Sequence, residues 1–199
     1  MIRSAMDETP IHVVRPGDVP RAVSLQTTAF TADPVMRWLW PEPREYLRHF
    51  PELVHGFGGG AFAHGAAHVT ASFVGGTLWL PPGVVPDEAA LERLIDETLA
   101  EPTRSECLSI LEQMGAAHPK EPHWHLAFIG VDPAHQGQGT GSALLRHTLA
   151  RVDEQGLHAY LESSNPANIS LYRRHGFEVI REIRVGGAPL VTPMIRVPA

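Results

Sequence analysis

The fold is decided by the stretch Val131-Asp132-Pro133-Ala134-His135-Gln136-Gly137-Gln138-Gly139-Thr140-Gly141-Ser142-Ala143-Leu144-Leu145. An apolar run ends at Asp132-Pro133, three glycines follow at alternating positions, and a run with helical apolar spacing begins immediately. Glycines let the backbone turn tightly and approach a ligand without interference from a Cβ atom. The free N–H groups and partial positive charge at the start of a helix attract a pyrophosphate. The stretch therefore predicts a strand, an anion-binding loop and a helix, and this anion site needs no lysine.

Two other classes of nucleotide-binding loop do not fit this stretch. A P-loop ends in Gly-Lys-Ser/Thr, whereas Gly141-Ser142 contains no lysine. A dinucleotide-binding fingerprint has glycine at its first, third and sixth positions, and Ser142 occupies the sixth position after Gly137 and Gly139. For the loop taken alone, a glycine-rich turn without a ligand stays an alternative.

The segments on either side of the loop alternate between strands and helices. In the C-terminal half, apolar runs and helical spacing predict strands over 124–131, 159–163, 178–185 and 191–197, and helices over 142–154 and 167–175. In the N-terminal half, the same signals predict strands over 11–15, 67–74 and 77–80, and helices over 19–29, 44–57, 87–100 and 104–114. Gly75-Gly76 is predicted to form a hairpin turn, and Asp33-Pro34 to end the first helix. This order is typical of an α/β domain with helices packed on a central sheet.

Composition excludes several classes of protein. The 199 residues suit a single domain, and a hydrophobic content of 43% is enough for a sizeable core. The net charge is −6, and Lys120 is the only lysine among 16 basic residues, so a nucleic-acid-binding face is not expected. Cys107 is the only cysteine, which excludes an intrachain disulfide and a cysteine-rich zinc site and suits a reducing compartment.

No segment is predicted to enter a membrane. Residues 1–20 carry charged side chains throughout and contain no apolar leader. Residues 53–86 lack Asp, Glu, Lys and Arg, but glycine and proline interrupt them too often for a spanning helix, which needs about 20 predominantly apolar residues. We therefore expect a cytoplasmic protein.

Two motifs, one strand apart, resemble those of the GNAT superfamily of acyl-CoA-dependent N-acetyltransferases. Gln136-x-x-Gly139-x-Gly141 matches the Gln/Arg-x-x-Gly-x-Gly/Ala signature of that superfamily, and the run from Asn168 through Tyr172 to Gly176-Phe177 resembles its C-terminal helix motif. Residues 117–185 are also similar to puromycin N-acetyltransferase-like proteins. The resemblance implies one GNAT domain over 1–199, with a mixed, splayed sheet of six or seven strands and helices on both faces. Residues 1–118 would mainly form the acceptor side, and 119–185 the acetyl-CoA-binding core.

The resemblance also implies a reaction and a cosubstrate. An acetyl group would pass from acetyl-CoA to a primary amine of a small molecule by direct attack in a ternary complex. The thioester would lie between strands 124–131 and 159–163, with a backbone N–H near Ile129 as oxyanion donor. The residues expected to bind acetyl-CoA are the backbone of Ile129, Gly130 and Val131, the loop residues Gln136, Gly137, Gln138, Gly139, Thr140, Gly141 and Ser142, and Asn165, Asn168 and Tyr172.

Tyr172 and Glu162 are the candidate catalytic residues. A phenol with an ordinary pKa of about 10 is protonated at neutral pH, so Tyr172 can donate a proton to a departing thiolate. The alternative is a tyrosine buried in the core. Glu162 lies within an apolar strand on the same face as Tyr160 and could deprotonate the ammonium directly or through a water. A hydrogen-bonded structural acid is the alternative for Glu162, as turn chemistry is for the asparagines around Pro166.

Histidine, aromatic and cysteine side chains are further candidates for roles near the acceptor site. His118, His123 and His125 could form a zinc site, but no further ligand stands at characteristic spacing, so we expect no metal. One of these histidines could instead face the acceptor. Trp38, Trp40, Trp79 and Phe73 could form an aromatic acceptor pocket, or belong to the core. Cys107 is expected to pack in a helix without acting as a nucleophile.

Two further functions stay open at this stage. One is acetylation of a protein N-terminus or lysine, and the other is an acyl-CoA-binding sensor without turnover. We expect a small-molecule amine as partner and neither nucleic acid nor membrane. A homodimer stays open because dimers are common in the fold.

Overall fold

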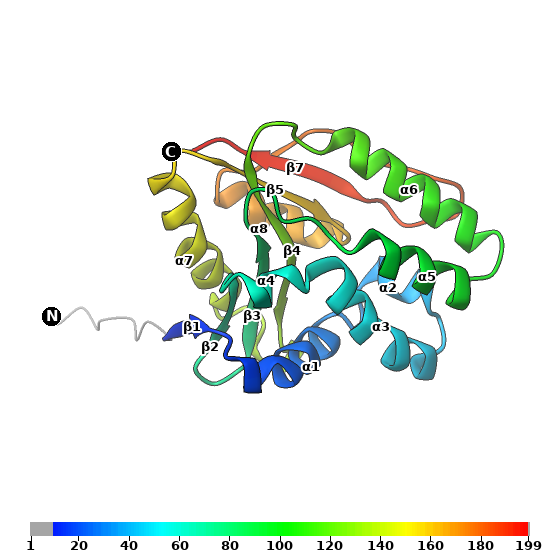
Figure 1. Cartoon of the computed structure of the whole chain (residues 1–199), viewed down its shortest axis with the longest axis horizontal. Helices are drawn as coiled ribbons and strands as arrows, with labels where there is room; N and C mark the ends of the chain where they lie inside the picture. Colours follow the sequence, from blue (N-terminus) through cyan, green and yellow to red (C-terminus); the bar gives the residue numbers. More distant parts are fainter. Residues whose placement is uncertain (1–9, 199) are drawn as a thin grey trace, which may run out of the picture.

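The fold is built around a mixed sheet of seven strands (Figure 1). The structure is a computed structural model that describes residues 10–198, and its strands follow the order β1-β2-β3-β4-β5-β7-β6 across the sheet. Strands β4 and β5 are parallel, and every other neighbouring pair is antiparallel. The strands are β1 (Ile11–Val13), β2 (Ala67–Thr70), β3 (Gly75–Leu80), β4 (His123–Val131), β5 (His158–Ser163), β6 (Glu178–Val179) and β7 (Thr192–Arg196).

Helices cover both faces of this sheet, which confirms the expected fold class. Along β3, Leu78 and Leu80 belong to one apolar core and Trp79 to a second core, because successive strand residues point to opposite faces. Helices α1, α3, α5 and α6 contribute to the first core, and α7 to the second. The helices are α1 (Val19–Ala29), α2 (Pro34–Leu39), α3 (Pro43–Gly58), α4 (Gly60–Ala63), α5 (Glu88–Thr98), α6 (Thr103–Ala117), α7 (Thr140–Glu154) and α8 (Ile169–Arg174). Within residues 10–198, none of them combines the length and apolar character needed to cross a membrane.

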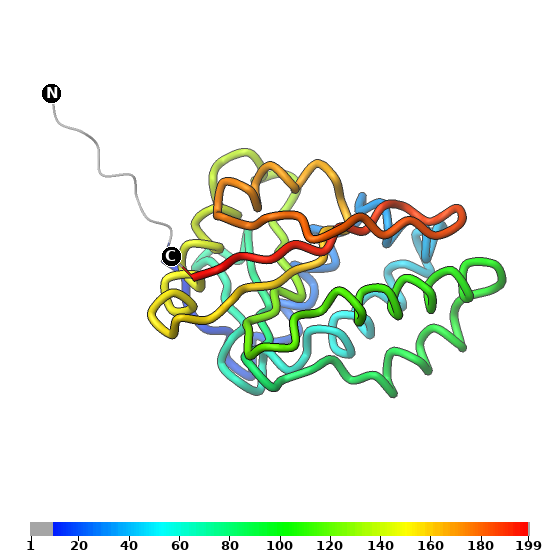
Figure 2. Tube along the Cα trace, turned by 90° about the horizontal axis from the view of Figure 1, so that it is seen from above, coloured from blue at the N-terminus to red at the C-terminus, as the bar shows by residue number. Residues whose placement is uncertain are grey.

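Helix α6 and the loop before β7 extend together at one end of the molecule (Figure 2). The carboxylate of Glu106 in α6 accepts a hydrogen bond of 3.1 Å from the backbone N–H of Gly187. This contact ties α6 to a loop that follows it by 81 residues in the sequence.

The predicted turn at Gly75-Gly76 is wrong. Both glycines lie inside β3, and the turn spans 71–74. The hydroxyl of Thr70 accepts hydrogen bonds from the N–H groups of Val74 and Gly75 at 3.1 and 3.2 Å, which closes the turn earlier than expected. The glycines serve close packing instead: a Cβ on Gly75 would lie 2.7 Å from Cγ2 of Thr140, and one on Gly76 would lie 3.0 Å from the carbonyl oxygen of His68.

Three further boundaries differ from the prediction. Asp33-Pro34 does follow the end of α1, but it also begins α2, because Asp33 Oδ1 accepts the N–H groups of Val35 and Met36. The short helix α4 begins at Gly60, between the helix predicted over 44–57 and the strand predicted over 67–74. The strand predicted over 178–185 is reduced to β6, because residues 178–182 are exposed and only Ile183 re-forms a bridge, to Val191.

Candidate active site

A cleft opens in the sheet where β4 and β5 separate. The two strands pair only from His123 and His158 to Leu126 and Leu161. The next residue of β4, Ala127, is an extra residue in the ladder with β3, because Leu126 pairs with Trp79 and Phe128 with Leu78. An extra residue of this kind bends a strand and disrupts its hydrogen bonding. Among the described residues no strand pairs with 127–131 on the β5 side, so backbone groups there can bind a ligand.

The loop after β4 presents the start of α7 to this cleft. Asp132 Oδ1 accepts the N–H of Ala134 at 2.8 Å, and the side-chain amide of Gln136 donates to the carbonyl of Val131 at 3.1 Å. Gly137 and Gly139 have φ angles of 74° and 87°, in the left-handed region that favours glycine. Gly139 is the N-cap of α7, a helix of 15 residues, so the free N–H groups of its first turn are available to an anion.

Twelve of the thirteen expected acetyl-CoA residues line this cleft, which has a volume of about 570 Å³. The exception is Gln138, which does not line the cleft. The hydroxyl of Ser142 is engaged by His175 Nε2 at 2.6 Å, which leaves its backbone N–H as the group available to a phosphate. Asn165 Oδ1 accepts the N–H of Ala167 at 3.0 Å, so part of its role is the turn chemistry considered above. His135 and Arg174 also line the cleft and had no sequence signal.

Tyr172 stands where this cleft meets a second cavity, and lines both. Its side chain is buried, and this burial, together with the negative charge of Asp33, raises the pKa of its hydroxyl. The hydroxyl is therefore protonated at neutral pH. Asp33 accepts a hydrogen bond of 2.6 Å from the hydroxyl of Ser164 and joins α2 to the end of β5. This contact spans 131 residues and has no local sequence signal.

Glu162 is buried in the second cavity and is held by two histidines. Its carboxylate lies 2.8 Å from His125 Nε2 and 3.8 Å from His118 Nδ1, and its side chain is 6% exposed. Burial by itself would raise the pKa of Glu162, but the charge of His125 and its hydrogen bond to the carboxylate, with the polar groups of His118 and Tyr160 nearby, outweigh burial and lower the pKa to about 2. Glu162 is thus an ionised carboxylate in an otherwise apolar environment.

The second cavity has a volume of about 150 Å³ and is almost entirely apolar. Its walls come from α2, α3, α5, α6 and the split strands. Among the described residues that line it, Glu162 is the only one with a carboxylate. Ser164, Asn168 and Tyr172 also line this cavity, and Asn168 and Tyr172 line the cleft as well.

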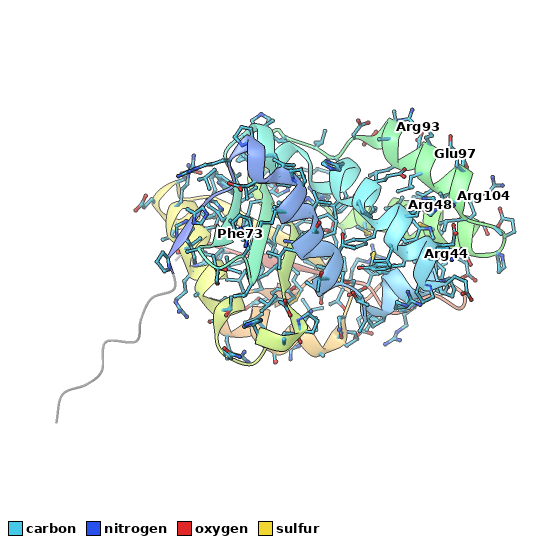
Figure 3. The ribbon with its side chains drawn as sticks, turned by 90° about the horizontal axis from the view of Figure 1, so that it is seen from below. Arg44, Arg48, Phe73, Arg93, Glu97 and Arg104 are labelled. Carbon is cyan, nitrogen blue, oxygen red and sulfur yellow. The ribbon has the colours of Figure 1, made fainter. Side chains whose placement is uncertain are left out.

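Two of the four aromatic residues that could form an acceptor pocket line the second cavity. Trp38 and Trp40 line the second cavity, whereas Trp79 is fully buried in the core against α7. Phe73 lies in the β2–β3 turn, where its ring packs under the guanidinium of Arg21, at 3.8 Å from the guanidinium carbon to the ring centroid. Figure 3 shows Phe73 far from the arginines on the outer sides of α3, α5 and α6, which are helices that wall the second cavity. The strand face of Trp79 and the turn position of Phe73 decide these two cases.

Cys107 also lines the second cavity. Burial raises the pKa of its thiol to about 11, so it stays protonated, as a packing residue would. Among residues 10–198, no three His, Cys, Asp or Glu side chains are grouped as a metal site would require.

The geometry matches one family of enzymes. Residues 32–177 match the model of the acetyltransferase (GNAT) family. The chain belongs to the GNAT family. It is therefore an acyltransferase, and members of this family use acetyl-CoA as a cosubstrate.

Relatives of this GNAT protein carry acetyltransferase names. An uncharacterized N-acetyltransferase of Schizosaccharomyces pombe is 30% identical over 176 residues, which is 80% of this chain and 70% of that protein. The N-alpha-acetyltransferase RimI of Mycobacterium tuberculosis is 36% identical over 86 residues, which is 41% of this chain and 53% of that protein. A crystal structure from Corynebacterium glutamicum, described as histone acetyltransferase HPA2 and related acetyltransferase, is 25% identical with a TM-score of 0.66, and the match covers 95% of this chain and 96% of that one.

The left-handed backbone at Gly139 gives a test of the loop. An alanine there must adopt a strained conformation, which costs about 1–2 kcal/mol, and relaxation of the loop would displace the first N–H groups of α7. We expect Gly139→Ala to raise the Kd for acetyl-CoA at least tenfold, measured by isothermal titration calorimetry. The matched control is Gly65→Ala, which has a φ of 62°, open space around its Cβ position and no place in the cleft. Equal affinities of the two variants would contradict the role given to the loop.

Proposed function

We propose that the chain transfers the acetyl group of acetyl-CoA to the primary amine of a small molecule with an apolar body and a single positive charge. The observation that carries the proposal is the junction at Tyr172 between a cleft suited to a pyrophosphate and an apolar cavity with one carboxylate. Each substrate thus has a separate approach, and both approaches end at the same side chain.

The cleft fits acetyl-CoA on three counts. The unpaired edge of β4 at Ile129, Gly130 and Val131 can pair with the amide groups of the pantetheine arm as an added strand does. The loop from Gln136 to Ser142 and the start of α7 suit the pyrophosphate. Asn165 and Asn168 line the opposite wall, from which a side-chain amide can bind the arm. When bound, acetyl-CoA supplies an activated thioester carbonyl.

The cavity fits an amine with an apolar body. A buried ammonium needs a partner of opposite charge, and Glu162 provides it. The surrounding side chains include Trp38, Leu94 and Ile110, which suit an aromatic or aliphatic body. A second cation in the same molecule would lie in an apolar environment without a carboxylate, at a cost of several kcal/mol. These features support a monoamine over a diamine.

The residues at the junction support turnover over binding alone. Glu162 accepts a proton from the bound ammonium, and the free amine nitrogen attacks the thioester carbon. A C–N bond forms, negative charge develops on the carbonyl oxygen, and a backbone N–H near Ile129 stabilises it by about 3 kcal/mol. The C–S bond then breaks, and the Tyr172 hydroxyl donates its proton to the departing thiolate. The raised pKa of Tyr172 keeps that proton in place until the thiolate forms.

Replacement of Tyr172 by phenylalanine tests this assignment. The ring stays in the core, but the proton for the thiolate is lost. We expect kcat to fall by about 10²–10⁴-fold, while the Kd for acetyl-CoA changes by less than about threefold. Thiol release and calorimetry measure the two quantities. An unchanged kcat would remove Tyr172 from the mechanism.

A pair of amines tests the acceptor class. Both 2-phenylethylamine and 1,4-diaminobutane carry a primary amine, but the second compound places another cation where the cavity is apolar. We expect kcat/KM for 2-phenylethylamine to exceed that for 1,4-diaminobutane by at least about 100-fold, because an unpaired buried charge costs several kcal/mol. Preference for the diamine would contradict an apolar acceptor site. Acetylation of a peptide N-terminus or lysine, with neither amine accepted, would favour a protein substrate.

A further inference from the structure

A chain of hydrogen-bonding side chains leads from Glu162 toward the surface. Glu162 contacts His125 at 2.8 Å and His118 at 3.8 Å. His118 Nε2 lies 2.8 Å from His123 Nε2, and His123 Nδ1 lies 2.7 Å from the carbonyl oxygen of Glu121. The exposed fraction of the side chain rises from 6% at Glu162 to 33% at His118. This series of contacting side chains therefore begins at the carboxylate proposed to bind the amine and ends at solvent.

The acceptors in this chain determine which ring nitrogens carry hydrogen. A carbonyl oxygen can only accept, so His123 Nδ1 donates to Glu121, and the other nitrogen of a neutral His123 accepts. His118 Nε2 must then donate to His123 Nε2. A neutral His118 consequently has no hydrogen on Nδ1, and this basic nitrogen faces Glu162.

His125 cannot take the same part. An ionised carboxylate can only accept, so His125 Nε2 donates to Glu162 at 2.8 Å and already carries a hydrogen on the nitrogen that faces it. The edge of Phe57 from α3 packs against the His125 ring, at 5.6 Å between centroids, and the side chain is 5% exposed. His125 orients the carboxylate, whereas His118 presents a free basic nitrogen to it.

The surroundings of His118 suit a proton that arrives and leaves. The titratable groups around its ring are Tyr160 and Glu162 from β5 and His123 and His125 from β4. Tyr160 packs against the ring at 4.5 Å between centroids. The charge of Glu162 stabilises an imidazolium at His118, and the exposed part of the ring can pass the proton to water.

We propose that His118 Nδ1 accepts, through Glu162, the proton that the acceptor amine loses, and that His123 positions His118 for this transfer by fixing its tautomer. The proposal rests on the proposed amine acetylation. The ammonium N–H bond breaks and its electron pair stays on the amine nitrogen. The proton binds the Glu162 carboxylate and then moves to His118 Nδ1, which restores the carboxylate and leaves an imidazolium that loses a proton to solvent.

This proton relay, from the amine through Glu162 to His118, explains how a weak base such as the Glu162 carboxylate can deprotonate the amine. His125 holds Glu162 as a carboxylate, which favours binding of a cation but disfavours retention of its proton. A second acceptor at ion-pair distance removes that proton before the thioester is attacked. The 3.8 Å separation exceeds hydrogen-bond length, so the imidazole must approach by rotation when the amine binds.

The kinetic test replaces His118 by phenylalanine, which keeps a ring against Tyr160 and removes both nitrogens. We expect kcat at pH 7 and saturating amine to fall about 10–100-fold and to recover in part when imidazole is added to the buffer. The pH profile of kcat should differ between the wild type and His118→Phe, because the variant has no group at this position that can accept the proton. The control is His147→Phe, which replaces an exposed histidine that takes no part in these hydrogen bonds, and its kcat should match that of the wild type. An unchanged kcat, or an equal loss at every pH without imidazole rescue, would overturn the proposal.

A second measurement needs no turnover. Nitrogen-15 NMR of the histidine rings in wild-type protein above pH 8 should show His123 with hydrogen on Nδ1 and His118 with hydrogen on Nε2. Hydrogen on Nδ1 of neutral His118 would overturn the relay even if the enzyme is active. A wild-type protein that acetylates no amine would instead overturn the proposed function, while the ring tautomers still decide whether the chain of hydrogen bonds exists.

Discussion

The parallel pairing of β4 and β5 stops at Leu126 and Leu161, where the extra residue Ala127 bends β4. The rest of the site depends on this interruption. It frees the backbone edge of 129–131 and lies where the cleft and the apolar cavity meet, with Tyr172 lining both and Glu162 lining the cavity. Continuous pairing would close the site and leave two separate cores.

A second constraint is the scarcity of charge inside the molecule. Among the described residues that line the cavity walled by α2, α3, α5 and α6, one has a carboxylate. The side chains that pair with this carboxylate are the histidines His118 and His125. Histidines can change their charge near neutral pH, as arginine or lysine cannot. In the proposed mechanism, Glu162 beside His118 and His125 provides an anion for binding a cation and a place for the proton that the cation must lose.

Local patterns in the sequence were sufficient for much of this arrangement. The strand, glycine loop and helix around Gly139 could be predicted because tight turns and helix starts are governed by neighbouring residues. Glu162 stood out because a carboxylate in an apolar strand needs a partner, and the partner is His125 on the adjacent strand. The grouping of His118, His123 and His125 is explained by their hydrogen bonds to one another and to Glu162.

Contacts between distant segments could not be predicted in this way. Asp33 and Ser164 meet across 131 residues, and nothing near either of them indicates the pair. The hairpin turn was misplaced because Gly75 and Gly76 resemble turn residues, although close contacts with Thr140 and His68 require them in the strand. Phe73, a candidate for the acceptor pocket or the core, lies in the turn itself. Tertiary packing, which a single sequence does not display, decides such cases.

The separation of β4 and β5 can be tested most directly by a crystal structure of the wild-type protein with acetyl-CoA bound. The account requires the pantetheine arm along 129–131, the thioester carbon between the two strands, and its sulfur within hydrogen-bond distance of the Tyr172 hydroxyl. A thioester bound elsewhere, or a sulfur beyond reach of Tyr172, would contradict it.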